Sequence, residues 1–209
     1  IDEPSQFIVN LKKIYPGIHW YKDTRKEKDY QPSIRPHILK QFFKEFPNLG
    51  KNVFYNDSDI LFYKLPDFNI LIEDDIGYVS DTINYIGYNY IKECCDRYSN
   101  KYSELPALDL LNKMADTANI SVELIKENQD NSGGAQYLLK NIDSDYWEQV
   151  EIDSNSLSKV MKEYEKKYPI PHHIQKWTAD MWAVLWNYWK KGFKTKIHSE
   201  ISFSWATHK

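Results

Sequence analysis

Two aspartates one residue apart, Asp57 and Asp59, are the residues whose types and spacing most clearly indicate chemistry. They follow an apolar and aromatic run at residues 52–56 that predicts a buried strand. On an extended backbone both carboxylates lie on one face and Ser58 on the other. Two like charges this close become favourable beside a hard divalent cation, which takes oxygen ligands and completes its shell with phosphate oxygens and water. The pair therefore predicts a Mn²⁺ or Mg²⁺ site that binds a diphosphate, and an ordinary Asp-rich turn is the alternative.

Three further segments carry polar groups or glycines in suggestive places. Tyr30 and Arg35 precede a predicted helix, consecutive glycines lie in the segment 132–137, and Asp180 opens a second helix in the segment 177–182. Together with Asp57-Ser58-Asp59 and a late Lys196-Ile197-His198, their order resembles the GT-A fold of DxD-containing, nucleotide-sugar-dependent glycosyltransferases, of the glycogenin-like or glycan-synthesis type. The resemblance extends from about residue 15 to the end of the chain, and it depends on the order of the segments.

The resemblance implies a fold and an activity. The fold is α/β: a Rossmann-like three-layer sandwich with a mixed, mostly parallel central sheet flanked by helices and a ligand cleft at the carboxyl ends of the strands. The activity is hexosyl transfer, dependent on Mn²⁺ or Mg²⁺, from a nucleoside diphosphate sugar, with UDP favoured, to a glycan, glycoprotein or glycolipid acceptor. We expect residues 1–209 to form a single domain. The nucleotide-binding strand with which the family begins is not found ahead of the first predicted helix, which would fit a shortened N-terminus.

The resemblance also assigns roles to individual residues. The metal would be held by Asp57, Asp59 and His198, with His208 as a competing third ligand. The nucleotide would contact Tyr30, Arg35, Asp57 and Ser58. The donor sugar would face Gly133, Gly134, Gln136 and Asp180. Asp180 would also be the catalytic group, either as the base that activates the acceptor hydroxyl or as a group that positions the sugar.

Each of these residues has a structural alternative. For Tyr30 and Arg35 taken singly, an ordinary structural role, such as an exposed arginine beside a helix start, fits the sequence equally well. Gly133-Gly134 fits a tight turn into a strand. Asp180 is suited to compensating the dipole at the N-terminus of its helix.

Composition limits the functional classes that fit this chain. The chain has 209 residues, of which 42% are hydrophobic, 15% aromatic and 27% charged, and its net charge is −3 with a pI near 6.1. A slightly acidic chain has no bulk attraction for nucleic acid. Adjacent cysteines, Cys94 and Cys95, do not form a useful disulfide, which favours a reducing compartment. No apolar run is long enough for a transmembrane helix, so we expect a cytoplasmic, soluble protein, for which peripheral association with a membrane stays open.

Periodicity predicts the elements that position these groups. Apolar spacing predicts helices over 4–15, 34–46, 105–114, 143–167 and 179–191, with the helix over 143–167 mostly facing solvent. The last helix has a wide tryptophan face, which is typical of a core element. Strands are predicted over 18–21, 60–63, 77–80, 120–125, 135–139 and 195–198.

Two functional classes compete with glycosyl transfer. One is a metal-dependent hydrolase or nucleotidyltransferase that uses Asp57 and Asp59, although such two-metal sites usually need further carboxylates. The other is a non-catalytic carbohydrate-binding α/β domain, in which the aspartates form a turn and the tryptophans form a stacking platform.

Overall fold

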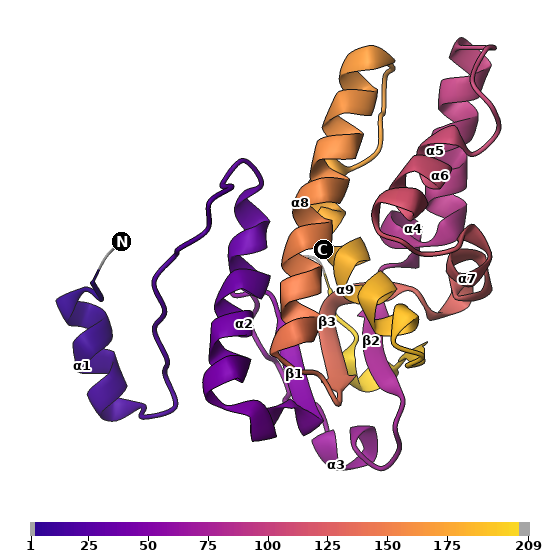
Figure 1. Cartoon of the computed structure of the whole chain (residues 1–209). Coiled ribbons are helices and arrows are strands. Elements are labelled where there is room, and N and C mark those ends of the chain that lie inside the picture. Colours follow the sequence, from indigo (N-terminus) through magenta and orange to yellow (C-terminus); the bar gives the residue numbers. More distant parts are fainter. Residues whose placement is uncertain (1–2, 205–209) are drawn as a thin grey trace.

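The computed structural model describes residues 3–204 (Figure 1). Its helices are α1 (Gln6–Ile14), α2 (Ile34–Glu45), α3 (Phe68–Leu71), α4 (Ile83–Ile86), α5 (Tyr88–Lys101), α6 (Asp109–Thr117), α7 (Val122–Glu127), α8 (Ser144–Lys167) and α9 (Ala179–Lys190). Its strands are β1 (Asn52–Asn56), β2 (Gly77–Asp81), β3 (Gly133–Lys140) and β4 (Thr195–Ile197). Within the described range, no helix combines the length and the apolar character needed to cross a membrane.

The four strands form one mixed sheet in the order β1-β3-β2-β4. Strand β3 runs antiparallel to both of its neighbours, and only β2 and β4 pair in parallel. The α/β class is therefore confirmed, whereas the prediction of a mostly parallel sheet is wrong. The physical reason is that β3 lies between β1 and β2 and runs in the opposite direction to both, so two of the three pairings are antiparallel.

The two faces of the sheet contribute to hydrophobic clusters of different size. Tyr55, Tyr137 and Val79 are cross-strand neighbours on the face that joins the large hydrophobic core. Phe54, Leu138 and Tyr78 alternate with them, and they belong to a small second cluster. This alternation is the period of two that a pleated strand imposes.

The helical layer covers only one of these faces. Figure 1 shows α2 and α8 side by side over the sheet, with α9 next to α8. The small cluster on the other face is covered by Leu71 and Phe68 of α3 and by Ile201 of a 3₁₀ turn at residues 199–201. The predicted three-layer sandwich is therefore wrong for residues 3–204, because a single short helix and a turn replace its third layer.

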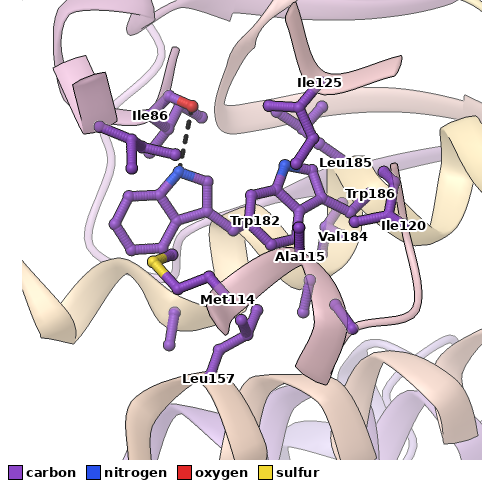
Figure 2. Packing of buried hydrophobic residues seen from close by; sticks show 14 of the residues in the cluster. Ile86, Met114, Ala115, Ile120, Ile125, Leu157, Trp182, Val184, Leu185 and Trp186 are labelled. Atoms are coloured by element: carbon purple, nitrogen blue, oxygen red, sulfur yellow. Dashed lines mark hydrogen bonds between the residues drawn. The ribbon is translucent and has the colours of Figure 1, made fainter. Parts of the chain in front are cut away.

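Helix α9 is at the centre of the core, as its tryptophan face predicts. Trp182 and Trp186 are fully buried, and Figure 2 shows them packed among apolar side chains from α6, α7 and α8. The indole of Trp182 donates a hydrogen bond of 3.0 Å to the carbonyl of Ile86. Trp189 donates one of 2.8 Å to Thr195, which ties α9 to β4. Helix α9 is therefore a rigid support for anything at its N-terminus.

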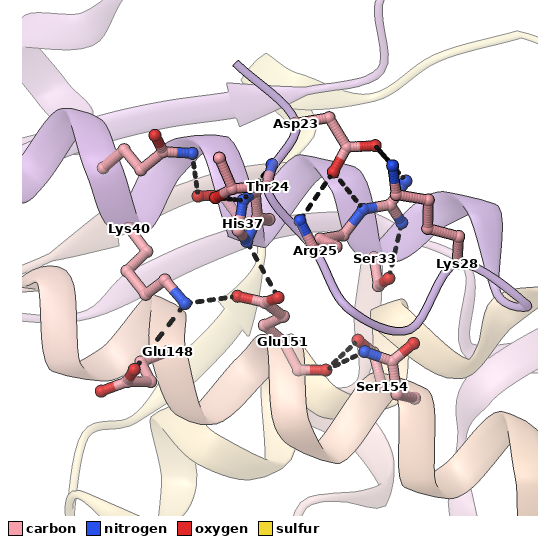
Figure 3. Close-up of polar contacts among 12 residues, drawn as sticks. Asp23, Thr24, Arg25, Lys28, Ser33, His37, Lys40, Glu148, Glu151 and Ser154 are labelled. Carbon is pink, nitrogen blue, oxygen red and sulfur yellow. Dashed lines mark hydrogen bonds and ion pairs between the residues drawn. The ribbon is translucent and has the colours of Figure 1, made fainter. Parts of the chain in front are cut away.

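Helix α8 is also a core element, so the expectation that it mostly faces solvent is wrong. It buries residues along its whole length, including Trp147, Val150, Leu157 and Met161. Glu151 of α8 accepts hydrogen bonds of 2.9 Å from His37 and 2.7 Å from Lys40, both on α2 (Figure 3). The polar positions that suggested a solvent face are thus partly used to attach α2.

Three predicted strands are wrong. Residues 18–21 pair with none of the described strands, and His19 instead contacts the rings of Phe42 and Phe46 on α2. Residues 60–63 form an irregular loop with no neighbouring strand. Residues 122–127 form helix α7, because the hydroxyl of Ser121 caps its first turn at the N–H of Leu124.

Candidate active site

Asp57 directly follows β1 and is part of the candidate site. Its N–H donates a hydrogen bond of 3.3 Å to the carbonyl of Ala135 at the start of β3. Asp57 and Asp59 both line a cavity of about 640 Å³, which we call the Asp57 cavity. Its other walls are residues 60–66, Ala135, Gln136, Ser199, Glu200 and residues 202–204. The two aspartates follow a strand, as predicted, but β1 is half-buried rather than buried, and Ser58 and Asp59 lie in a turn, so the extended backbone that would place both carboxylates on one face is not formed.

The cavity wall formed by residues 60–66 is attached to Glu200 at its C-terminal end. Glu200 accepts a hydrogen bond of 2.9 Å from the N–H of Asp67 and lies 3.7 Å from the ammonium of Lys64. Leu61 and Tyr63 of the same wall project into solvent. The cavity lining therefore combines the carboxylates of Asp57 and Asp59 with exposed apolar side chains.

Arg35 connects the cavity to the helical face of the sheet. Its guanidinium donates one hydrogen bond to Asp57 through Nη1 and another to Asp180 through Nη2. The partners differ in environment: the side chain of Asp180 is 5% exposed and that of Asp57 is 37% exposed. Burial opposes the charge of Arg35, but Tyr55, Asp180 and Asp57 outweigh it, so the pKa of Arg35 is raised. Three residues far apart in the chain thus form one charged unit.

Tyr30 fixes the buried end of this unit. Its phenol lies 2.7 Å from both the carboxylate Oδ1 of Asp180 and the carbonyl of Trp177, and it accepts a hydrogen bond of 3.1 Å from the N–H of Asp180. Burial raises the pKa of Asp180, while Arg35 and Tyr30 oppose the rise. Tyr30 is only 6% exposed, so its ring offers no open face to a nucleobase in this structure.

A buried arginine holds the turn that presents Tyr30 and Arg35. The guanidinium of Arg25 donates to both carboxylate oxygens of Asp23, at 2.9 and 3.0 Å. It also donates to the hydroxyl of Ser33 at 2.8 Å (Figure 3) and to the carbonyl of Tyr30 at 3.3 Å. These bonds satisfy a buried charge and set the backbone between Tyr30 and α2.

The backbone beside Asp57 is strained. Ala135 has φ = 68°, a left-handed conformation that costs a non-glycine residue about 1–2 kcal/mol. The hydroxyl of Ser80 holds the backbone on both sides of Ala135: it donates to the carbonyl of Gly134 and accepts a hydrogen bond of 3.2 Å from the N–H of Gln136. Strain of this kind is concentrated at functional sites, and here it lies on the cavity wall.

The two predicted sugar-facing glycines lie against the protein itself. A Cβ on Gly133 would lie 2.1 Å from the carbonyl oxygen of Ser80, and one on Gly134 would lie 2.1 Å from the phenol oxygen of Tyr137. Close packing therefore accounts for both glycines. Gln136, the third member of that group, does line the Asp57 cavity.

The remaining predicted ligands do not join the two aspartates. His198 uses Nδ1 to accept a hydrogen bond of 3.1 Å from the N–H of Glu200, and its ring packs edge-on against Tyr78 with centroids 5.0 Å apart. Ser58 is exposed and is not part of the cavity wall. His208 lies outside the described residues.

The donor set at Asp57 and Asp59 fits a hard divalent cation only in part. Two carboxylates facing one cavity are suitable oxygen ligands for Mn²⁺ or Mg²⁺ that take their remaining ligands from phosphate and water. Between residues 3 and 204, no group of three or more His, Cys, Asp or Glu side chains is placed to hold a metal. Asp57 is moreover already paired with Arg35. A bound cation would therefore need other ligands and a rearranged Asp57.

Several residues of the site were missed from sequence. Tyr55 and Tyr137 stack with ring centroids 5.6 Å apart. Burial raises the pKa of both phenols, and the nearby charges act on them in opposite directions: Asp180 raises the pKa and Arg35 lowers it. Arg25 and Ser80 hydrogen-bond to the backbone next to the site, Arg25 at Tyr30 and Ser80 at Gly134 and Gln136. The alternating pattern of β1 and β3 could have placed Tyr55 and Tyr137 on one face, but nothing in the sequence pairs Arg25 or Ser80 with the site.

Comparisons with known proteins add no evidence for function beyond the geometry of the site. No protein-family model matches the chain, and neither the curated proteins nor the solved structures include a significant match.

Proposed function

We propose that the chain is a metal-dependent glycosyltransferase that moves a sugar from a nucleoside diphosphate sugar, with UDP favoured, to a hydroxyl of a glycan, glycoprotein or glycolipid. One observation carries the proposal. Arg35, Asp57 and Asp180, which are distant in sequence and were each expected to face the donor, are joined by hydrogen bonds next to a cavity lined by Asp57 and Asp59. A turn formed by Asp57-Ser58-Asp59 alone would need no such network.

In this proposal Asp57 and Asp59 would hold Mn²⁺ or Mg²⁺, which would supply positive charge to the leaving diphosphate. The guanidinium of Arg35, which is hydrogen-bonded to Asp57, would supply a second positive group beside the cavity, and its planar fork suits phosphate oxygens. The cavity volume of about 640 Å³ is in the range of small-molecule sites. The residues 60–66 and Gln136 then surround the part of the donor that follows the phosphates.

Asp180 is better suited to positioning than to acting as a base. Both of its carboxylate oxygens already accept hydrogen bonds, from Tyr30 and Arg35, and its side chain is nearly inaccessible. A general base must reach the acceptor hydroxyl. We therefore assign Asp180 the role of orienting Arg35, and Tyr30 the role of holding Asp180.

The test is a donor screen. UDP-sugars, GDP-sugars and CMP-sugars are incubated with the chain and Mn²⁺, and release of the nucleotide is measured with and without sugar acceptors. The proposal predicts Mn²⁺-dependent release from one nucleotide class that is lost in Asp59→Ala. A control, Asp75→Ala, removes an equal charge from an acidic loop outside the cavity and should retain activity. Release from none of the donors by the folded chain would contradict the proposal.

A further inference from the structure

We infer that the chain forms a symmetric dimer in which α1 of each copy docks on an apolar and acidic surface of the other copy. This surface, which we call the 61–72 face, consists of exposed side chains from the loop after β1, from α3 and from the residue that ends α3: Leu61, Phe62, Tyr63, Leu65, Ile70 and Ile72. The contact needs no ligand in the Asp57 cavity, so it does not depend on the proposed activity.

Helix α1 is poorly supported by its own chain. It comprises nine residues, none of which is buried, and an isolated helix shorter than about 12–15 residues is only marginally stable in water. Figure 1 shows α1 apart from the other helices, at the end of an extended connection. Between α1 and Trp20 lies an open groove of about 360 Å³. A helix placed in this way is expected to be stabilised by a partner.

The surface of α1 indicates the chemistry of that partner. Phe7, Leu11 and Ile14 lie at i, i+4 and i+7, so they form one apolar stripe. Phe7 and Ile14 are each 69% exposed. The only charged residues of the helix are Lys12 and Lys13 in its last turn. The partner of α1 should therefore be both apolar and acidic.

The 61–72 face is a continuous apolar surface. Its most exposed members are Leu61, which is 89% exposed, and Tyr63, which is fully exposed. Phe54 joins the loop to α3, because its ring lies 6.1 Å from that of Phe62 and 5.1 Å from that of Phe68. Exposed apolar patches of this kind are typical of interaction sites.

Negative charge surrounds the 61–72 face. Exposed carboxylates lie along the same stretch of chain, among them Asp59, Asp67 and Glu73. The one basic residue between positions 57 and 75 is Lys64, whose ammonium lies 3.7 Å from Glu200. The 61–72 face is thus complementary to α1 in both polarity and charge.

The connection to α1 favours docking on a second copy. His19 packs against Phe42, and Tyr21 donates a hydrogen bond of 2.7 Å to Glu45, so the connection is attached to α2 on the helical side of the sheet. The cluster that supports the 61–72 face lies on the opposite side. Only residues 15–18 join α1 to His19, and four residues reach at most about 14 Å. Helix α1 therefore reaches the face of a second copy more readily than its own.

A reciprocal contact explains why the assembly closes as a dimer. Each copy carries both surfaces, which is the condition for a two-fold symmetric interface. Specific interfaces bury roughly 800 Å² of each partner, and a nine-residue helix about 14 Å long supplies only part of this area. Two such contacts, exchanged between the same two copies, double the buried area.

The experiment is sedimentation velocity of the full chain from about 1 to about 200 µM, and circular dichroism establishes that each variant is folded. We expect wild type to pass from monomer to dimer in this range. One variant combines Lys12→Glu with Lys13→Glu, and the other combines Asn69→Lys with Glu73→Lys on the 61–72 face. Each variant places like charges across the contact, so each should dimerise about tenfold or more weakly than wild type.

An equimolar mixture of these two variants is the decisive sample. In the mixed dimer, the α1 that carries two glutamates meets the face that carries two added lysines, and the second contact is wild type. The mixture should therefore dimerise within about threefold of wild type, although neither variant does so alone. Docking of α1 on its own chain could not produce this recovery.

Ile14→Ser tests the apolar stripe and should weaken dimerisation by about tenfold or more. Its matched control is Ile152→Ser, at an exposed position of α8. The control for the charge reversal combines Lys166→Glu with Lys167→Glu, two exposed lysines in the last turn of α8. Both controls should change dimerisation by less than about twofold.

Four results would overturn the inference. They are wild type that stays monomeric, whether α1 then folds onto its own chain or binds a lipid surface; dimers that both charge variants leave unchanged; a mixture that does not recover dimerisation; and effects of the α8 controls as large as those of the α1 variants. If the face variant does not fold, Ile14→Ser and the α1 charge variant decide against their α8 controls.

Discussion

The phenol of Tyr30 lies 2.7 Å from the carboxylate of Asp180, a residue 150 positions further along the chain. The same phenol contacts the carbonyl of Trp177 and accepts a hydrogen bond from the N–H of Asp180. A single hydroxyl therefore joins the turn before α2 to the first turn of α9. Because Asp180 in turn holds Arg35, Tyr30 controls the geometry of the site without contacting the Asp57 cavity.

Removing this hydroxyl should destabilise the fold and loosen the site. Tyr30→Phe leaves the buried Asp180 with fewer hydrogen bonds, and we expect the free energy of unfolding to fall by about 1–3 kcal/mol. Urea denaturation followed by circular dichroism measures the change. Tyr21→Phe is the matched control: its hydroxyl bonds the exposed Glu45 at 2.7 Å, and its loss should cost less than about 0.5 kcal/mol. Equal effects of the two substitutions would show that Tyr30 has no special role.

Gly134 is expected to tolerate no side chain. A Cβ there would lie 2.1 Å from the phenol oxygen of Tyr137 and 2.9 Å from Cε of Met181. We expect Gly134→Ala to lower the free energy of unfolding by about 1–3 kcal/mol through overpacking. The penalty should shrink in a Tyr137→Phe background, because the phenol oxygen, the atom nearest to the added Cβ, is then absent.

The control for this substitution is Gly17→Ala, since a Cβ on Gly17 meets no atom within 4 Å. Thermal denaturation of the three single variants and of the double variant provides the comparison. If the penalty of Gly134→Ala is the same in the Tyr137→Phe background as in wild type, contact with the Tyr137 phenol is not its cause.

The ion pair of Asp74 and Lys140 should make stability depend on pH. Burial raises the pKa of Asp74, but hydrogen bonds from Tyr78 and Lys140 outweigh it, so the pKa falls from its ordinary value of 3.8 to about 2. A carboxyl whose pKa is depressed in the folded state stabilises the fold above its unfolded pKa, and this contribution disappears as the pH falls from about 3.8 towards 2.

We therefore expect Asp74→Asn to be less stable than wild type by about 1 kcal/mol at a pH of about 6, a value limited by solvent because the Asp74 side chain is 43% exposed. The difference should narrow below a pH of about 4. Urea denaturation over the range from about pH 6 to about pH 3 measures it, with Asp75→Asn as a control that makes no bond to Lys140. A difference that stays constant with pH would contradict the ion-pair explanation.

The elements with strong local signals could be predicted from sequence. The apolar run at residues 52–56 ends in a polar residue and forms β1, and the tryptophan spacing of residues 179–191 forms α9. Helix α7 was mistaken for a strand because alternation over six residues also fits a short amphipathic helix, and the cap at Ser121 decides between them.

Individual residues of the site could be predicted from the sequence, but the contacts between them could not. Asp57, Arg35 and Asp180 were each singled out, but the bonds between them join positions 22 and 145 residues apart, and no local pattern encodes such contacts. Strand direction is similarly non-local, which is why the sheet was expected to be mostly parallel. The supporting bonds of Arg25 and Ser80 depend on backbone geometry that exists only in the folded chain.

The proposed function depends on a metal-dependent nucleoside diphosphate site at Asp57 and Asp59. Calorimetric titration of UDP, GDP and CMP, with and without Mn²⁺, tests it most directly on wild type, Asp59→Ala and the control Asp75→Ala. We predict that one diphosphate binds wild type and the control only with Mn²⁺, and that Asp59→Ala abolishes this binding. A folded wild-type chain that binds none of the three nucleotides, or binding that needs no Mn²⁺ and is unchanged in the Asp59→Ala variant, would contradict such a site.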